Sequence, residues 1–148
     1  MKKYTYFIIV FLILAGIVFS YNKYNQYATQ KVNLVRVLDG DTVVVSNFLH
    51  QEIHVRLVGL DCCETTVINR AYKQAYEKKI SIDEVIERGK ESTDILNRFL
   101  AENKGQLVLK AQGLDKYNRT LGIIYAGKTN INDYMVEKGK CSIFLYNE

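Results

Sequence analysis

Residues 35–64 read VRVLDGDTVVVSNFLHQEIHVRLVGLDCCE, and this stretch decides the fold. Its three runs of β-branched residues are separated by an Asp-Gly turn and by a Ser-Asn turn, a pattern typical of short antiparallel strands in a meander. Because side chains alternate between the two faces of a strand, the third run directs Ile53, Val55 and Leu57 toward a core. Arg56 then points to the opposite face, where a cleft can receive it.

Carboxylates gather where the predicted strands end. Asp39 and Asp41 lie in the first turn, and Asp61 and Glu64 follow the third strand. An Asp-Gly-Asp turn alone is ordinary turn chemistry. Several carboxylates at one site, however, repel one another unless a cation neutralises them, and oxygen ligands favour calcium, magnesium or manganese over zinc. Their convergence therefore predicts a divalent metal site.

Positive charge comes from two places in the sequence. Arg56 lies in the third strand, and a basic turn, DKYNR, follows at residues 115–119. A guanidinium group can hold a phosphate through two hydrogen bonds, so a metal and arginines together predict metal-assisted cleavage of a phosphodiester. Two plainer interpretations stay open, in which Arg56 is a surface arginine and the basic turn is only solvated.

In their order and spacing these segments resemble the staphylococcal nuclease (thermonuclease) family, from about Val32 to Tyr146. The resemblance implies that the carboxylates of Asp41 and Asp61 bind Ca²⁺. It also implies that the backbone carbonyl of Cys62 completes the protein ligands.

The same resemblance assigns catalytic roles. Glu64 corresponds to the glutamate that orients or deprotonates the attacking water. Arg56 and Arg119 correspond to two arginines that clamp the phosphate. Lys116 and Tyr117 lie in the same turn as Arg119 and are expected to contact a neighbouring phosphate or the sugar.

The resemblance breaks at Cys62-Cys63, where the family commonly has Thr-Pro. Three cysteines in an exported protein usually form one disulfide and leave one thiol. Adjacent cysteines bond to each other only with strain, which makes Cys141 the expected partner of one of them. In this architecture Cys141 leads into a final strand beside Asp61, which favours the Cys62–Cys141 pairing and places Cys63 second.

The first residues predict an export segment, because two lysines precede a long uncharged run. The densest apolar part, residues 7–19, is short for a spanning helix, and Ser20 ends a tolerable cleavage site. The whole uncharged stretch, in contrast, is long enough for an uncleaved anchor, and a buried core helix is the plainer alternative. The predicted organisation is a signal peptide or membrane anchor at 1–21, a spacer at 22–31 and a thermonuclease-like domain at 32–148.

The remaining patterns complete an α+β domain. Ser81–Glu84 is a capping box that opens a long helix with an apolar stripe, which Gly105 can end. Three further features are a helical piece at 71–76, strands at 106–111 and 120–125, and a short helix capped by Asn130 or Asn132 and ending at Gly139. We therefore expect a five-stranded OB-fold-like β-barrel with two or three helices, preceded by an N-terminal hydrophobic helix.

The length of 148 residues suits one compact domain with an extra segment. The formal net charge of +4 falls to +2 when the first segment is removed, because Lys2 and Lys3 go and no acid does. Such a small charge does not by itself identify a nucleic-acid partner.

As the resemblance implies, the expected function is a calcium-dependent, sugar-nonspecific nuclease that hydrolyses DNA and RNA, with the 5′-oxygen leaving. We expect a monomer that is secreted or anchored to the outer side of the bacterial cytoplasmic membrane. The main alternative is a non-catalytic OB-fold module that binds single-stranded nucleic acid at the cell surface. A third interpretation is a calcium-stabilised envelope domain with structural arginines.

Overall fold

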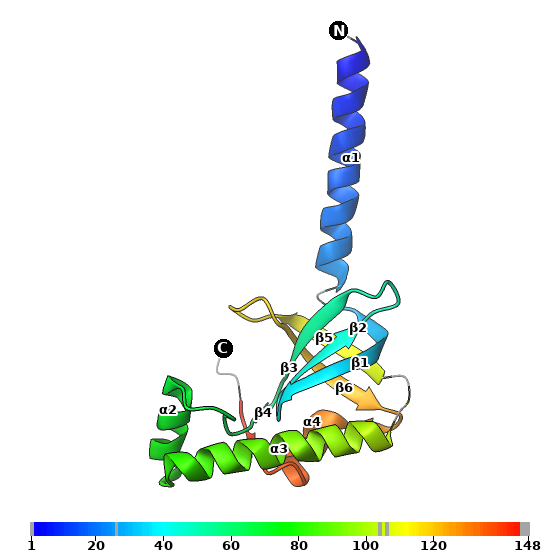
Figure 1. Cartoon of the computed structure of the whole chain (residues 1–148). Coiled ribbons are helices and arrows are strands. Elements are labelled where there is room, and N and C mark those ends of the chain that lie inside the picture. The colour runs from blue at the N-terminus through cyan, green and yellow to red at the C-terminus, as the bar shows by residue number, and fades with distance from the viewer. Residues whose placement is uncertain (1, 26, 104, 106, 146–148) are drawn as a thin grey trace.

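The computed structural model describes residues 2–25, 27–103, 105 and 107–145, which form four helices and eight strands (Figure 1). The helices are α1 (Lys2–Asn25), α2 (Asn69–Lys78), α3 (Ile82–Glu102) and α4 (Ile131–Glu137). The strands are β1 (Thr29–Asp39), β2 (Thr42–Ser46), β3 (Glu52–Leu57), β4 (Leu60–Asp61), β5 (Leu107–Leu114), β6 (Thr120–Ala126), β7 (Thr129–Asn130) and β8 (Ser142–Ile143).

Five of the strands close into a barrel. Antiparallel neighbours follow one another in the order β3, β2, β1, β5 and β6. A parallel pairing of β3 with β6 joins the two ends of this order, with residues 55–57 opposite residues 120–122. The predicted five-stranded OB-like barrel is therefore confirmed, and the α+β class with it.

The strands form where β-branched residues dominate. Val43, Val44 and Val45 of β2 are almost completely buried, as suits a strand with a neighbour on each side. β1 is longer and bends at two register shifts relative to β2, between Leu34 and Arg36 and between Val37 and Asp39. Irregularities of this kind increase the local twist, which helps a sheet to curl into a barrel.

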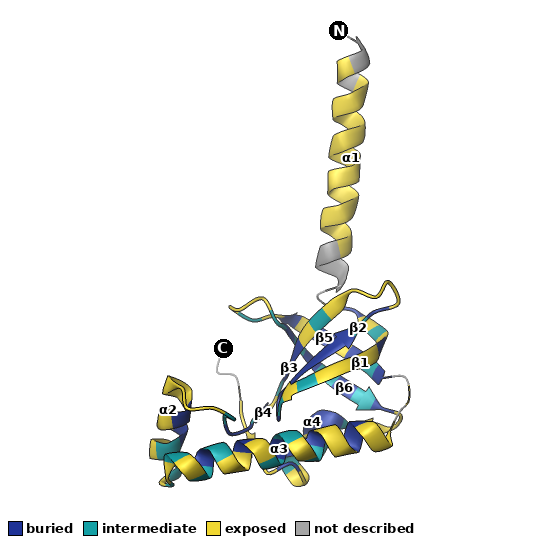
Figure 2. Cartoon of the chain, viewed as in Figure 1, coloured by how far each residue is buried: buried dark blue, intermediate teal, exposed yellow. Residues whose placement is uncertain are grey.

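The core lies between the barrel and two helices. The second half of α3 buries Leu96, Phe99 and Leu100 against the barrel interior, and the Phe99 ring lies 4.2 Å from the ring of Tyr134 in α4. The first half of α3 packs against α2 in a smaller cluster around Val85. Figure 2 shows the resulting pattern on α3, with buried positions along one side and exposed ones along the other.

The boundaries of α3 test the predicted caps. The Ser81 hydroxyl accepts a hydrogen bond from the Glu84 backbone N–H at 3.1 Å, so the predicted start is confirmed. The predicted end at Gly105 is wrong, because Asn103 already caps the helix after Glu102. The Asn103 side-chain amide donates to the Phe99 carbonyl oxygen at 2.8 Å. This bond helps to satisfy one of the last carbonyl groups of the helix, where regular backbone hydrogen bonding ends.

Other boundaries move by a few residues. β1 begins at Thr29, inside the expected spacer, because residues 29–32 pair with residues 107–110 of β5. β5 continues to Leu114 through a bulge near Gly113, and the expected strand residue Gln106 lies outside the described residues. Asn130, not Asn132, caps α4, which ends at Glu137 before the predicted Gly139.

α1 extends away from the barrel, and its described side chains are exposed (Figure 1, Figure 2). In the described ranges of the chain, no helix combines the length and the apolar character needed to cross a membrane. An export signal or anchor at residues 1–21 stays a prediction.

Asn132 ties α4 to the closed edge of the barrel. Its side chain is buried and donates to the carbonyl oxygens of Val58 at 2.8 Å and Gly122 at 3.1 Å. Its carbonyl oxygen accepts from the Ile124 backbone N–H at 3.2 Å. One amide therefore satisfies three backbone groups of the segments that flank the β3–β6 junction.

Replacing Asn132 with alanine should lower the free energy of unfolding by about 2–4 kcal/mol, because three backbone groups lose a hydrogen bond, although the Gly122 carbonyl keeps another, from the Val58 N–H. Urea denaturation followed by circular dichroism measures this change. Asn97→Ala, on the exposed side of α3, is the matched control and should change stability by less than about 0.5 kcal/mol. Equal losses in both variants would contradict the role of Asn132.

Candidate active site

One pocket of about 670 Å³ collects most of the predicted site residues. It lies where the first turn, β3, the loop after β4, the start of α2 and the turn between β5 and β6 meet. The predicted residues in its walls are Asp41, Arg56, Cys62, Glu64, Lys116, Tyr117 and Arg119. Asp61 joins the site through its carboxylate, which contacts Arg56. The structure therefore brings together residues that are up to about 80 positions apart in the chain.

A buried ion pair lies at the base of this pocket. Asp41 and Arg56 are only 4% and 8% exposed, and the Nη1 atom of Arg56 pairs with the Asp41 carboxylate. The Nη2 atom of Arg56 lies 3.2 Å from Oδ1 of Asp61. The register of β2 with β3, which sets Thr42 opposite Arg56, produces this contact. Buried charges are stable only when paired, so each group holds the other in place.

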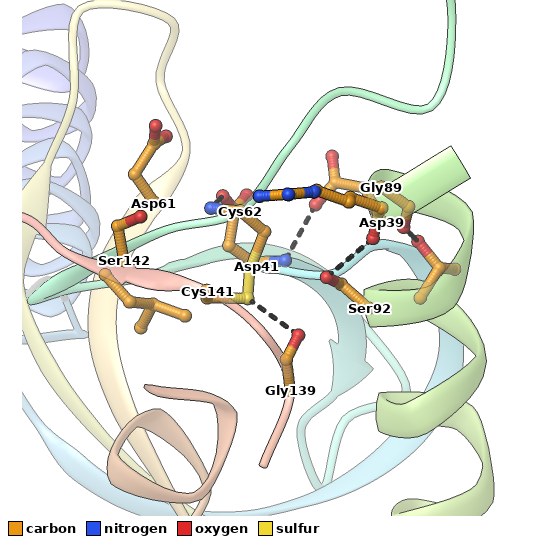
Figure 3. The surroundings of a disulfide bond; sticks show 12 residues. Asp39, Asp41, Asp61, Cys62, Gly89, Ser92, Gly139, Cys141 and Ser142 are labelled. Atoms are coloured by element: carbon orange, nitrogen blue, oxygen red, sulfur yellow. Dashed lines mark hydrogen bonds between the residues drawn. A yellow bond between two sulfur atoms is a disulfide. The ribbon is translucent and has the colours of Figure 1, made fainter. Parts of the chain in front are cut away.

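A disulfide fixes the loop that follows β4. Cys62 and Cys141 are bonded, with their Cα atoms 4.3 Å apart, which is the pairing that the sequence favours (Figure 3). β4 pairs with β8 next to this bond, and the Cys62 backbone N–H donates to Oδ2 of Asp41 at 2.9 Å. Cys63 remains a free thiol, and burial raises its pKa. Cys62 is therefore held by a covalent bond to Cys141 and by a hydrogen bond to Asp41, a predicted metal ligand.

The turn between β5 and β6 is built around Asp115. Its carboxylate accepts hydrogen bonds from the backbone N–H groups of Tyr117 and Arg119, each at 2.9 Å, and from Nε of Arg119 at 2.8 Å. Burial opposes ionisation of Asp115, but these hydrogen bonds outweigh it and lower its pKa. Asn118 adopts a φ of 63°, the left-handed conformation that asparagine tolerates. The carboxylate thus aims Arg119 into the pocket, with Tyr117 and Lys116 beside it.

Glu64 lies in the wall of the pocket with its side chain partly exposed. Burial raises the pKa of its carboxyl group, Asp39 and Asp61 add to this increase, and Arg70 opposes it. The Arg70 Nε atom lies 3.0 Å from the Glu64 carboxylate. Burial also raises the pKa of Asp39. Negative charge is therefore concentrated here and only partly compensated.

Sequence reasoning missed three residues that shape this pocket. Arg70 and Gln74 reach the loop from α2, and Gly89 meets it from α3. A Cβ atom on Gly89 would lie 2.7 Å from the carbonyl oxygen of Cys63 and closer still to that of Glu64, so only glycine lets α3 touch the loop. For Gln74, the sequence offered only its spacing of three residues from Ala71, which places both side chains on one face of a helix.

The oxygen donors suit a hard divalent cation such as calcium. Asp39, Asp41 and Glu64 share the pocket with Cys62, and burial raises the pKa values of Asp39 and Glu64, so their ionised forms carry a cost that a nearby cation would offset. Yet across the part of the chain that the structure describes, no three acidic, histidine or cysteine side chains are grouped closely enough to hold a metal ion. The donor chemistry fits calcium, whereas the ligand geometry stays a prediction.

Cys141→Ser should lower the free energy of unfolding by about 2–5 kcal/mol, since the lost bond spans 79 residues of chain. Reduction of the wild-type protein should have the same effect, and non-reducing peptide mapping should recover the Cys62–Cys141 pair. Cys63→Ser is the control: its stability should still fall on reduction, whereas that of Cys141→Ser should not respond. Three free thiols in the oxidised protein would contradict the pairing.

Residues 54–148 match the family model described as Staphylococcal nuclease homologue. Thermonucleases from Staphylococcus hyicus and Staphylococcus intermedius are 32% and 28% identical to the chain over 117 and 111 residues, which are 79% and 75% of this chain and 61% and 58% of those proteins. An uncharacterized endonuclease from Haemophilus influenzae is 30% identical over 106 residues, 72% of this chain and 48% of that protein. The chain spans about half to three fifths of the length of these relatives. Because the family model covers more than half of the chain, including Arg56, Glu64 and Arg119 of the pocket, the chain belongs to the staphylococcal nuclease family.

Proposed function

We propose that this protein is an exported, calcium-dependent nuclease that hydrolyses phosphodiester bonds in DNA and RNA. The observation that carries this proposal is the single pocket in which Asp41, Glu64, Arg56 and Arg119 meet. The names of the relatives, two thermonucleases and an endonuclease, support the reaction class. The uncharged N-terminal run supports export.

Asp41, Asp61 and the Cys62 carbonyl would hold the calcium ion. When bound, the ion supplies positive charge for the phosphate and lowers the pKa of a coordinated water. The disulfide and the hydrogen bond from the Cys62 N–H to Asp41 keep two of these ligands beside each other. Protein groups held in this way need little rearrangement when the cation arrives.

Glu64 orients the attacking water and accepts its proton. A carboxylate with a pKa above the ordinary value is a stronger base than an exposed one, and the burial of Glu64 produces such a shift. Its place in the pocket wall puts it within the same space as the two arginines.

Arg56 and Arg119 bind the phosphate and stabilise the additional negative charge of the transition state. Each is positioned by a carboxylate of the chain itself, Arg56 by Asp41 and Arg119 by Asp115. Lys116 lies 5.0 Å from the centre of the Tyr117 ring, and both side chains border the pocket on the same turn. This pair is placed to contact a neighbouring phosphate, sugar or base.

The purified protein should degrade single-stranded DNA and RNA in calcium buffer and stop when the cation is removed by chelation. A fluorescence cleavage assay with and without excess chelator, followed by re-addition of calcium, measures this dependence. Full activity in chelator would contradict the calcium assignment. Binding of single strands without cleavage in any divalent cation would instead favour the non-catalytic binding module.

Replacing Glu64, Arg56 or Arg119 with alanine should each lower kcat by about 100-fold or more, because each loses a group that acts in the transition state. The matched controls are Glu91→Ala and Arg36→Ala, whose ion pairs with Lys140 and Glu52 lie on the exposed surface. These controls should keep near-normal kcat. If folded Glu64→Ala and Arg56→Ala proteins also kept it, the catalytic site would lie elsewhere.

A further inference from the structure

The loop of residues 61–64, which carries the proposed calcium ligands and Glu64, is held by a single buried side chain from α2. Gln74 is 3% exposed. Its Nε2 group donates to the Cys62 carbonyl oxygen at 2.9 Å and to Oδ2 of Asp61 at 3.1 Å. Its Oε1 atom accepts from the Glu64 backbone N–H at 2.9 Å. One amide thus contacts three of the four residues in the loop.

The chemistry of these contacts requires an amide. Two donors and one acceptor are needed on the same planar group, and glutamine supplies both kinds at this length of side chain. A glutamate at position 74 would keep an acceptor for the Glu64 N–H but would offer no donor, when ionised, to the Cys62 carbonyl. A methionine would fill similar space and provide neither. The Cys62 carbonyl oxygen has two lone pairs, so its bond to Gln74 leaves one for a cation.

Contacts at both ends of α2 hold the helix, and with it Gln74, in place. Ala71 is completely buried in the cluster that joins α2 to Val85 of α3. Lys78, at the other end of the helix, donates to the Ser142 hydroxyl at 2.8 Å, and Ser142 lies opposite Asp61 in the β4–β8 pair. The helix therefore contacts both the strand that leads into the loop and the strand that follows the disulfide.

A second contact from α2 and a contact from α3 enclose the same loop. Arg70, on the first turn of α2, pairs with the carboxylates of Asp61 and Glu64. Gly89 of α3 brings the helix backbone against the Cys63 and Glu64 backbone. Contacts from both α2 and α3 therefore restrain the loop, whose remaining face borders the pocket.

We infer that Gln74 is a positioning residue of the active site: its amide fixes the Asp61 carboxylate, the Cys62 carbonyl and the Glu64 backbone in one arrangement that suits cation binding and water activation. This inference rests on the proposed nuclease function for its effect on catalysis. The fixing of the loop, in contrast, is a property of the chain alone and is measured without substrate or metal.

The experiment uses the full chain with Gln74→Met, Gln74→Glu and the control Lys73→Ala, which changes an exposed residue of α2 paired only with Glu77 in the ion pairs of the described chain. Backbone amide hydrogen exchange of Glu64, followed by NMR without metal, is the first measurement. Calcium titration by calorimetry and kcat on single-stranded DNA are the second and third.

In Gln74→Met, the backbone amide hydrogen of Glu64 should exchange at least about tenfold faster than in the wild type. Calcium affinity and kcat should each fall by about 10- to 100-fold, with KM nearly unchanged. Gln74→Glu should keep the Glu64 amide protected, because its acceptor remains, while kcat still falls. Lys73→Ala should match the wild type in all three measurements. This pattern separates positioning from a general loss of packing.

The inference would be overturned if the Glu64 amide exchanged in Gln74→Met at the rate of the wild type. It would also be overturned if Gln74→Met and Gln74→Glu lost protection of this amide equally. If Gln74→Met does not fold, Gln74→Glu decides by itself: unchanged kcat and calcium affinity would refute the positioning role. If the wild-type protein binds no calcium and cleaves no nucleic acid, the proposed function fails, and the exchange data still decide whether Gln74 fixes the loop.

Discussion

The parallel pairing of β3 with β6 is the contact on which the rest of the structure depends. It closes the barrel, and it sets Arg56 opposite Leu121, two residues after Arg119. Without this pairing the two arginines would belong to separate ends of an open sheet. Parallel pairing of strands far apart in sequence carries a large loop-closure cost, which the buried core beneath α3 and the Asn132 hydrogen bonds at the junction offset. Closure of the barrel therefore also brings the two arginines to one pocket.

The pocket at this junction contains charges that a stable core would normally exclude. Arg56 is almost buried and pairs with Asp41 and Asp61, whereas Asp39 and Glu64 have raised pKa values because burial disfavours their ionised forms. Burying charge is costly unless partners compensate it. Here the compensation is incomplete, since more carboxylates than guanidinium groups converge. Such an imbalance destabilises the folded chain, and the proposed binding of a cation would relieve it.

The loop after β4 is irregular but held by several contacts. A disulfide attaches Cys62 to the segment before β8, and the Gln74 side chain of α2 donates a hydrogen bond to the Cys62 carbonyl. Because Gly89 has no side chain, the backbone of α3 can pack against the loop. The resemblance noted from the sequence places Thr-Pro where this chain has two cysteines. Covalent attachment and hydrogen bonding therefore supply the rigidity that a proline would provide through its fixed φ angle.

Local patterns in the sequence determined the strands of the meander, the start of α3 at Ser81 and the placement of acidic residues at strand ends, because propensity, alternation and capping act between near neighbours. The family pattern added the roles expected for Arg56, Glu64 and Arg119. Only the tertiary structure decided how β3 meets β6 and that Arg70, Gln74 and Gly89 reach the loop. Those contacts join residues with no shared periodicity, and their free energy depends on burial and distance in the folded chain.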